Sequence, residues 1–319
     1  MVAASRRRPR VHVLGTGAMA CALGGRLARF GRALVTLVGT WREALDEIAL
    51  HGVTVEDGAG TWSAKVGVSS LFGPLGPADF VLVLVKSHQT DTVARVAARC
   101  LLPRGLAVTL QNGLGNRELL EVAAPGRVAQ GVALMGANTL GPGWVRVVPG
   151  RIVLGADAGA SGPLAPLADL LRASRIQTEV TAEIEQTIWR KLIVNCAINP
   201  LSALTGRPNG ALLEGPQPLD TLIRAAEEVG VVATAKGIHL GADAAALAVE
   251  VAKSTASNRS SMLQDLERGA QTEIDALNGA VIAEAQAVGV PTPVNEYLWR
   301  RVREREGRPL PPPAPSAGV

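Results

Sequence analysis

A glycine-rich turn between a short apolar run and a helical pattern constrains this chain more than any other feature. Gly15-Thr16-Gly17-Ala18-Met19-Ala20 follows the apolar residues 11–14 and fits the G-x-G-x-x-G/A pattern. In that pattern the first glycine allows a tight turn, the second lets the main chain approach a pyrophosphate, and the third small residue lets the helix pack on the strand. The turn therefore predicts a dinucleotide site, although an ordinary strand–helix turn can have the same pattern.

Strand and helix patterns alternate through the first half of the chain. Apolar or β-branched runs at 11–14, 33–38, 80–85 and 106–110 predict strands, and 18–30, 41–50 and 89–100 predict the helices between them. The run 80–85 is apolar on both faces, as a central parallel strand should be. A β-rich stretch follows at 127–135 and 144–154. We therefore expect an α/β domain of the Rossmann type over residues 1–181.

The character of the sequence changes after residue 181. Strand signals vanish, and helical patterns run over 183–199, 219–237, 242–254 and 262–288. We expect an all-helical second domain over residues 182–306, followed by a disordered, proline-rich tail over 307–319. Two domains fit a chain of 319 residues of which 47% are apolar.

Composition excludes several classes of function. The net charge is only +4 and aromatic residues make up 3% of the chain, which argues against a nucleic-acid binder. No apolar stretch is long enough to cross a membrane, and the basic residues near the start lead directly into a strand rather than a signal peptide. Cys21, Cys100 and Cys196 are too scattered for a disulfide framework, and zinc motifs are absent. We expect a cytoplasmic protein without a metal or a membrane partner.

The tip of the second predicted strand bears on the choice of cofactor. It ends at Gly39-Thr40, without the carboxylate that binds the ribose hydroxyl of NAD. Arg42 close by favours NADP(H), unless it is simply a solvated residue of the first helical turn. Lys86 and Asn112 each follow a strand at the carboxyl edge of the sheet, where open α/β folds bind ligands. A capping charge and an Asn-Gly turn are the plainer interpretations of these two residues.

The most informative helix carries a line of polar residues. Lys191, Asn195 and Asn199 recur at i, i+4 and i+8 and so share one face of an otherwise apolar helix. Burying an ammonium and two amides is costly unless partners are supplied. A bound polar ligand could be that partner. Alternatively, the three side chains form hydrogen bonds with backbone groups at the interface between the two domains. Asn209 follows on a loop that could fold back over this face.

A second polar cluster lies later in the helical half. Ser261 with Gln264 fits a capping box, so a helix should begin there, and its N-terminus could also hold a substrate carboxylate. Glu273 lies too far along an unbroken helix to share one small substrate with Ser261. Either the helix breaks near Gly269, or the two residues contact different parts of a larger cofactor–substrate assembly.

Taken together, these segments resemble the ketopantoate reductase (2-dehydropantoate 2-reductase) family from residue 11 to about residue 300. The matching segments are GTGAMA at Gly15, VLVLVKSHQTD around Lys86, LQNGLG at Asn112, IWRKLIVNCAINPLSAL around Lys191, PNG at Asn209, NRSSMLQD at Asn258 and TEIDALNG around Glu273. The family implies NADPH-dependent reduction of 2-dehydropantoate to (R)-pantoate, a step towards pantothenate and coenzyme A.

The resemblance also implies residue roles. Lys191 matches the proton donor. The matched substrate contacts are Lys191, Asn195, Asn199, Asn209, Asn258 and Ser261, and the matched cofactor contacts are Gly15, Thr16, Gly17, Ala18, Met19, Ala20, Lys86, Asn112, Ala137 and Glu273. Members often carry an arginine where this chain has Gly39-Thr40, which leaves NAD open. A reductase of another 2-oxo acid, a β-hydroxyacid dehydrogenase and a non-catalytic NADP-binding sensor are the alternatives, and a homodimer is compatible with the helical half.

Overall fold

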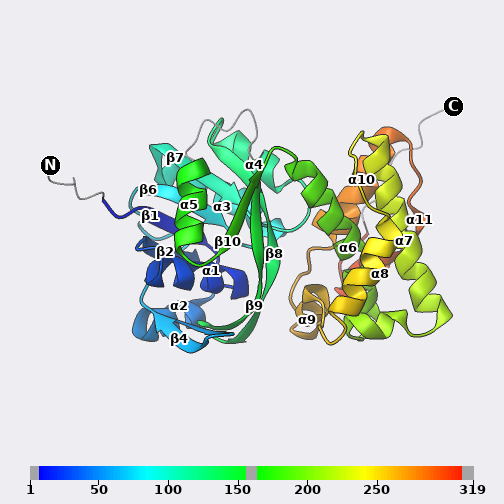
Figure 1. Ribbon diagram of the computed structural model, residues 1–319, viewed down its shortest axis with the longest axis horizontal. Coiled ribbons are helices and arrows are strands. Elements are labelled where there is room, and N and C mark those ends of the chain that lie inside the picture. Colours follow the sequence, from blue (N-terminus) through cyan, green and yellow to red (C-terminus); the bar gives the residue numbers. More distant parts are fainter. Residues whose placement is uncertain (1–6, 156–163, 311–319) are drawn as a thin grey trace. The chain divides into compact units, whose positions relative to one another are not determined.

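The computed structural model describes residues 7–155 and 164–310 (Figure 1). Its contacts divide the chain into two compact units. The first contains the residues through Gln111 together with Gly115–Ile184, and the second contains Asn112–Leu114 and the residues from Glu185 on. The sequence pattern places the boundary at residue 181 and gives no sign that Asn112–Leu114 belongs with the second unit.

The first unit alternates strands and helices. Its elements are β1 (Arg10–Leu14), α1 (Ala18–Arg29), β2 (Leu34–Gly39), α2 (Arg42–His51), β3 (Val53–Asp57), β4 (Gly60–Ala64), β5 (Gly67–Ser70), β6 (Ala78–Val83), η1 (Ser87–Gln89), α3 (Thr90–Cys100), β7 (Leu101–Thr109), α4 (Asn116–Ala123), β8 (Val128–Gly141), β9 (Trp144–Gly155), α5 (Leu164–Ala173) and β10 (Gln177–Thr181). The predicted elements all occur, with shifted ends. The local sequence patterns did not predict β3, β4, β5, β10, α4 or α5.

The strand order confirms the Rossmann-type prediction. Strands β5, β2, β1, β6, β7 and β8 lie side by side in that order and pair in parallel. In chain order this is the 3-2-1-4-5-6 arrangement of dinucleotide-binding sheets. Strand β9 returns antiparallel to β8, and β3 and β10 both pair with β9. The order reverses between β1 and β6, which is the point where such sheets bind ligands.

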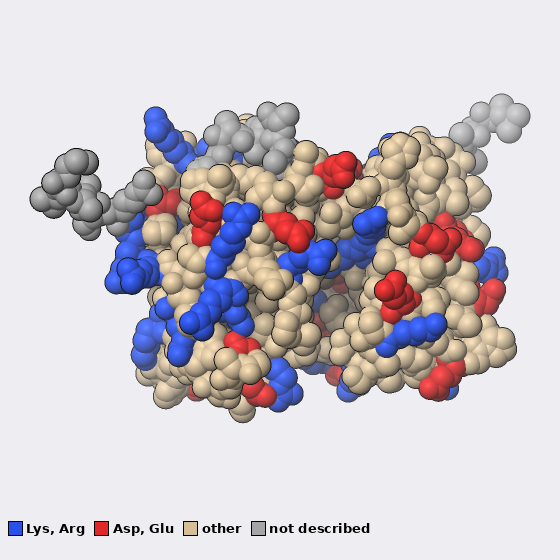
Figure 2. Space-filling model, viewed as in Figure 1, with Lys and Arg blue, Asp and Glu red and all other residues tan. Residues whose placement is uncertain are grey.

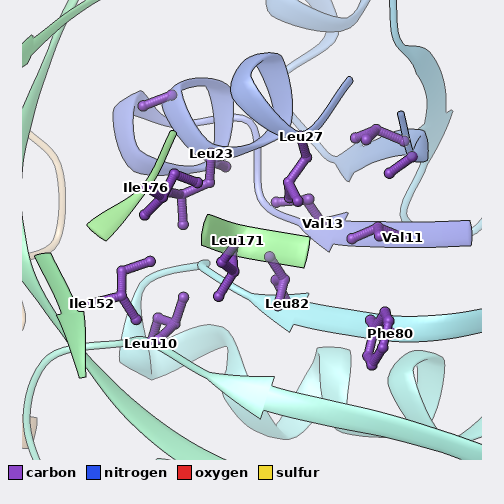
Figure 3. Close-up of a cluster of buried hydrophobic side chains, with 14 of the residues drawn as sticks. Val11, Val13, Leu23, Leu27, Phe80, Leu82, Leu110, Ile152, Leu171 and Ile176 are labelled. Carbon is purple, nitrogen blue, oxygen red and sulfur yellow. The ribbon is translucent and has the colours of Figure 1, made fainter. Parts of the chain in front are cut away.

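Apolar residues on both faces of the central strands pack against helices. On one face, Leu23 and Leu27 of α1 and Leu171 of α5 join Val13 of β1 and Leu82 of β6 in a single core (Figure 3). On the other face, the neighbouring strand residues pack with α3 and α4. This alternation explains why the run 80–85 is apolar at every position.

Helices and helical turns are the regular elements of the second unit within its described residues, as predicted. Its elements are α6 (Ile184–Thr205), η2 (Asn209–Leu213), α7 (Pro216–Ala235), α8 (Ala244–Ser254), α9 (Ser261–Glu267), the π-turn η3 (Asp275–Gly279), α10 (Ala280–Val288) and α11 (Pro293–Arg305). Trp189 of α6, Leu222 of α7 and Leu298 of α11 are fully buried in one apolar cluster with side chains from the other helices. No helix within 7–155 or 164–310 is long and apolar enough to cross a membrane.

Three expectations about this unit need comment. The helical pattern over 262–288 is not one helix, and the break near Gly269, one of the two alternatives for Ser261 and Glu273, is found: the φ of +64° at Gly269 ends α9. The helix predicted to stop at Asn199 continues through Pro200 to Thr205. The predicted tail is in part ordered: Arg308 pairs with Asp275 and, at 2.9 Å, with Glu306. Residues 311–319 lie outside the described residues.

Basic and acidic side chains stand beside one another on the face shown in Figure 2. In the first unit, Arg26 pairs with Asp57 at 2.6 Å and Arg151 pairs with Glu179 at 3.2 Å. Such pairs neutralise much of the arginine excess locally.

Candidate active site

The turn between β1 and α1 is shaped by its two glycines. Gly15 has φ +135°, and a Cβ there would lie 2.9 Å from the Leu84 carbonyl oxygen at the end of β6. A Cβ on Gly17 would meet no protein atom within 4 Å, so the main chain is open on that side. Gly17 caps α1 without a side-chain bond, and the first turn contains no acidic residue. The first N–H groups of a helix have no acceptor within it, so this turn fits a pyrophosphate.

Close packing against Thr16 explains the missing side chain at the tip of β2. A Cβ on Gly39 would lie 2.7 Å from Thr16 Cγ2, and Thr16 is buried. Position 39 therefore offers no side chain to the ribose of a bound dinucleotide, and the nearest charged residue that follows in the sequence is Arg42. Arg42 begins α2 with 93% of its side chain exposed, and its Nε lies 3.8 Å from the Asp46 carboxylate. An exposed pair at that distance holds the arginine weakly.

A buried polar network supports the segment that carries Lys86. This residue is half-buried and precedes η1. Gln111 donates from Nε2 to the Val85 carbonyl at 2.9 Å and to Thr90 Oγ1 at 2.8 Å. Thr90 donates in turn to Asn116 at 2.7 Å. These supporting residues were not predicted from the sequence; the one local signal is that Gln111 directly precedes Asn112 at the end of a strand.

Lys191 lies on α6 in a partly buried position. Asn195 is also partly buried and Asn199 is almost fully buried, so the predicted polar line is retained in the fold. Desolvation lowers the pKa of the Lys191 ammonium from 10.5 to about 8, and the nearby Glu273 carboxylate opposes this shift. An amine with that pKa is mainly protonated at pH 7 and yet is a stronger acid than an ordinary lysine.

Glu273 is held in the irregular segment between α9 and α10. Its side chain is buried, and Asn112 donates from Nδ2 to Glu273 Oε2 at 3.1 Å. The loop of Asn112 docks on this segment, since Leu114 N donates to the Ala276 carbonyl at 3.0 Å. Gly113 has φ +82°, and a Cβ there would lie 2.2 Å from the same carbonyl oxygen. The structure thus brings Asn112, Glu273 and Lys191 together in the second unit.

Asn209 and Asn258 come together through their loops. Asn209 N donates to the Asn258 carbonyl at 2.9 Å, and Asn209 Nδ2 donates to Thr255 Oγ1 at 2.9 Å. The Asn209 side-chain oxygen is buried without a hydrogen-bond partner among the described residues. A buried acceptor without a partner is costly, and a hydroxyl group of a bound ligand would satisfy it. Asn258 itself is exposed.

The helix start near Ser261 differs from the prediction. Ser260, not Ser261, caps α9: its Oγ accepts from Leu263 N at 3.1 Å and donates to the Asn199 carbonyl at 3.3 Å. Gln264 bonds the Arg259 carbonyl instead of closing a capping box. Ser261 is exposed as the first residue of the helix. Sequence reasoning missed Ser260 because the Ser-x-x-Gln spacing starts one residue later.

The remaining predicted cofactor contact, Ala137, lies on β8 opposite Val147 and packs against the core of the first unit. Within the described ranges, no group of three or more His, Cys, Asp or Glu side chains could hold a metal ion. The three cysteines are buried and free, and burial raises the pKa of the Cys21 thiol to about 12.

Comparison with known proteins agrees with this architecture. The sequence model described as "Ketopantoate reductase PanE/ApbA" matches residues 11–159, and that of "Ketopantoate reductase PanE/ApbA C terminal" matches residues 183–306. The 2-dehydropantoate 2-reductase of Halobacterium salinarum is 36% identical over 93% of this chain and 100% of its own length.

Solved structures show the same fold. A PanE/ApbA family ketopantoate reductase from Ralstonia eutropha is 34% identical, with a TM-score of 0.83 over 93% of this chain and 98% of that one. D-Mandelate dehydrogenase in complex with NADH and anilino(oxo)acetate, 23% identical with a TM-score of 0.85 over 93% of this chain and 98% of that one, shares the fold. The chain therefore belongs to the ketopantoate reductase family, whose members are NADP-dependent oxidoreductases that act on CH–OH groups.

Proposed function

We propose that this protein reduces 2-dehydropantoate to (R)-pantoate with NADPH, and that Lys191 is the proton donor. One observation carries the proposal: an ammonium lies partly buried beside the Glu273 carboxylate, with its pKa lowered to about 8. A general acid works best when its pKa is near the working pH. The relatives named 2-dehydropantoate 2-reductase support the choice of substrate, and its product would serve the synthesis of pantothenate and coenzyme A.

In this proposal Lys191 acts on the ketone oxygen. When bound, NADPH would supply the hydride that adds to the carbonyl carbon. The Lys191 ammonium would stabilise the negative charge that develops on the oxygen, first by a hydrogen bond from Nζ and then by donating a proton. The Glu273 carboxylate favours the charged form of Lys191 and so keeps this amine protonated near neutral pH. The Asn112 amide holds the Glu273 carboxylate in place by its hydrogen bond of 3.1 Å.

The substrate offers groups that match the polar side chains of the second unit. 2-Dehydropantoate carries a carboxylate, a ketone and a primary hydroxyl. We assign the hydroxyl to the unpartnered buried Asn209 oxygen, which can only accept. Asn195 and Asn199 would bind the oxygens around the ketone, and Asn258 and Ser261 would bind the carboxylate.

The proposed cofactor contacts are the residues that the sequence predicted. The open main chain at Gly17 fits the pyrophosphate, with Gly15, Thr16, Ala18, Met19 and Ala20 completing the turn. Lys86 and the exposed Arg42 would supply positive charge for the 2′-phosphate that distinguishes NADPH from NADH. Ala137, Asn112 and Glu273 complete the proposed set.

The test is oxidation of NADPH by the purified protein, with 2-dehydropantoate compared against a panel of other 2-oxo acids and with NADH in parallel. We expect a clear preference for 2-dehydropantoate and NADPH. Lys191→Ala should lower kcat by roughly 10²–10⁴-fold while NADPH binding stays near wild type. Lys253→Ala removes an exposed lysine of α8 and serves as the matched control.

Other outcomes would assign the protein differently. Turnover of another 2-oxo acid in preference would keep the reaction type and change the substrate. Tight NADPH binding without turnover on any 2-oxo acid would favour a sensor. A Lys191→Ala variant with more than about a tenth of the wild-type rate would refute Lys191 as the donor.

A further inference from the structure

Helix α6, which carries Lys191, runs through a proline without ending. Pro200 lies inside the helix. A proline has no N–H to donate to the carbonyl four residues earlier, and its ring crowds that oxygen and bends the helix. The carbonyl concerned belongs to Cys196, which is fully buried. Without a substitute donor, Cys196 O would be a buried acceptor with no partner.

Asn278 supplies the missing donor. Its Nδ2 donates to the Cys196 carbonyl at 3.0 Å and to Asn295 Oδ1 at 2.9 Å. Asn278 and Asn295 are both 0% exposed. Asn278 comes from the π-turn η3, in which Gly279 N donates to the Ile274 carbonyl at 3.0 Å, five residues back. A π-turn inserts one extra residue into a helix and often occurs at functional sites.

Two further helices hold Asn278 in this orientation. Asn295 donates from Nδ2 to the Ala225 carbonyl at 3.0 Å and to Glu228 Oε2 at 2.8 Å, both on α7. The Glu228 carboxylate accepts from Val294 N and Asn295 N, each at 2.9 Å, and so caps the start of α11. A chain of hydrogen bonds therefore runs from α7 through α11 and η3 to the Cys196 carbonyl of α6.

The hydrogen bond between Asn278 and the Cys196 carbonyl joins the two segments that carry the proposed catalytic pair, Lys191 and Glu273. Lys191 lies one to two turns before Cys196 on α6. Glu273 lies just before η3, and Leu277 N donates to the Glu273 carbonyl at 3.0 Å. We propose that Asn278 is a positioning residue: by donating to the Cys196 carbonyl, which Pro200 leaves without its helical donor, it holds α6 in place against the segment that carries Glu273. The inference rests on the proposed role of Lys191, and Asn278 itself touches no reacting atom.

A double-mutant cycle tests the hydrogen bond between Asn278 and the Cys196 carbonyl. Asn278→Leu keeps the approximate size of the side chain and removes the donor, so Cys196 O loses its partner. In a Pro200→Ala background, the new N–H at position 200 can bond that carbonyl instead. We expect Asn278→Leu to raise the unfolding equilibrium constant about tenfold in the wild-type background and clearly less in the Pro200→Ala background.

The lost bond to Asn295 is common to both backgrounds and cancels in the cycle. Equal losses in the two backgrounds would overturn the proposal. If Asn278→Leu alone does not fold, folding of the double variant supports the proposal, and failure of both variants to fold overturns it.

A second measurement separates positioning from a purely structural role. The chain has five lysines, Lys65, Lys86, Lys191, Lys236 and Lys253. Mass spectrometry can therefore follow the acetylation of Lys191 alone as a function of pH. We expect the midpoint for Lys191, in the Asn278→Leu variant, to rise by about one pH unit, because a loosened helix is better hydrated.

Val232→Ala, a fully buried truncation on α7 that touches none of these hydrogen bonds, is the control for lost stability. It should destabilise the protein without moving the midpoint. An unchanged Lys191 midpoint in destabilised Asn278→Leu would leave Asn278 a structural residue only and overturn the proposal. The labelling needs neither cofactor nor substrate, so it reports on this inference even if Lys191 proves not to be the proton donor.

Discussion

Replacing Lys191 by methionine should stabilise the protein at neutral pH while it removes the proposed proton donor. Burial lowers the pKa of the Lys191 ammonium from 10.5 to about 8, net of the attraction of Glu273. At 1.36 kcal/mol per pH unit, the fold disfavours the charged amine by about 3 kcal/mol. Partial exposure of the side chain reduces the usable part to about 1–3 kcal/mol. A neutral side chain of similar length escapes this cost.

The sign of the pH dependence follows from the lowered pKa. Above about pH 10.5 the amine is neutral in both the folded and the unfolded chain, so wild type and Lys191→Met should be equally stable. As the pH falls from there to about 8, the unfolded chain binds the proton first and wild type loses stability. The full advantage of Lys191→Met should therefore appear below about pH 8.

Thermal unfolding at pH 7 and at pH 10.5 measures the effect. We expect Lys191→Met to raise Tm at pH 7 by about 3–10 °C and to change it little at pH 10.5, where half of the unfolded lysines are already neutral. Lys253→Met, at an exposed position on α8, should show no such gain. A lower Tm for Lys191→Met at pH 7, or a gain of the same size at both pH values, would refute the reasoning that the ammonium is desolvated.

Three further predictions concern the loop at Gly113, the cofactor and the substrate hydroxyl. Gly113→Ala should lower Tm by several degrees more than Gly115→Ala, because both sites have φ above +80° but only a Cβ at position 113 meets a carbonyl, at 2.2 Å; equal losses would contradict docking of this loop on Ala276. Arg42→Ala should raise the Kd for NADPH about tenfold with little change for NADH or for Tm, and equal effects on both cofactors would remove Arg42 from the 2′-phosphate site. Asn209→Leu should cost about tenfold or more in kcat/KM for 2-dehydropantoate but much less for an analogue without its hydroxyl, and parallel losses would exclude the hydroxyl contact.

The fold of the first unit could be predicted because its signals are local. The Gly15–Gly17 turn, the doubly apolar run of β6 and the regular alternation of strands and helices are each visible within a few residues. The short strands β3, β4 and β5 carry few apolar residues and depend on neighbours distant in sequence, so no local period marks them.

The polar line on α6 was also visible from sequence, because a period of four residues needs no knowledge of the rest of the chain. The partners of that line were not. Asn112 reaches Glu273 from the other half of the sequence, and Ser260 reaches the Asn199 carbonyl across a long separation. A proline normally predicts a helix end, and so the helix was expected to stop before Pro200. Only the tertiary structure shows that Asn278 compensates for the missing N–H.

The pH dependence of kcat/KM for 2-dehydropantoate reduction tests the central claim most directly. If the Lys191 ammonium donates the proton with a pKa of about 8, kcat/KM should be level below that pH and fall tenfold per pH unit above it. Constant NADPH and substrate binding across the range, measured separately, would assign the break to the donor. A profile that stays level to pH 10 would contradict the account, because a neutral amine would then support the reaction as well as a charged one.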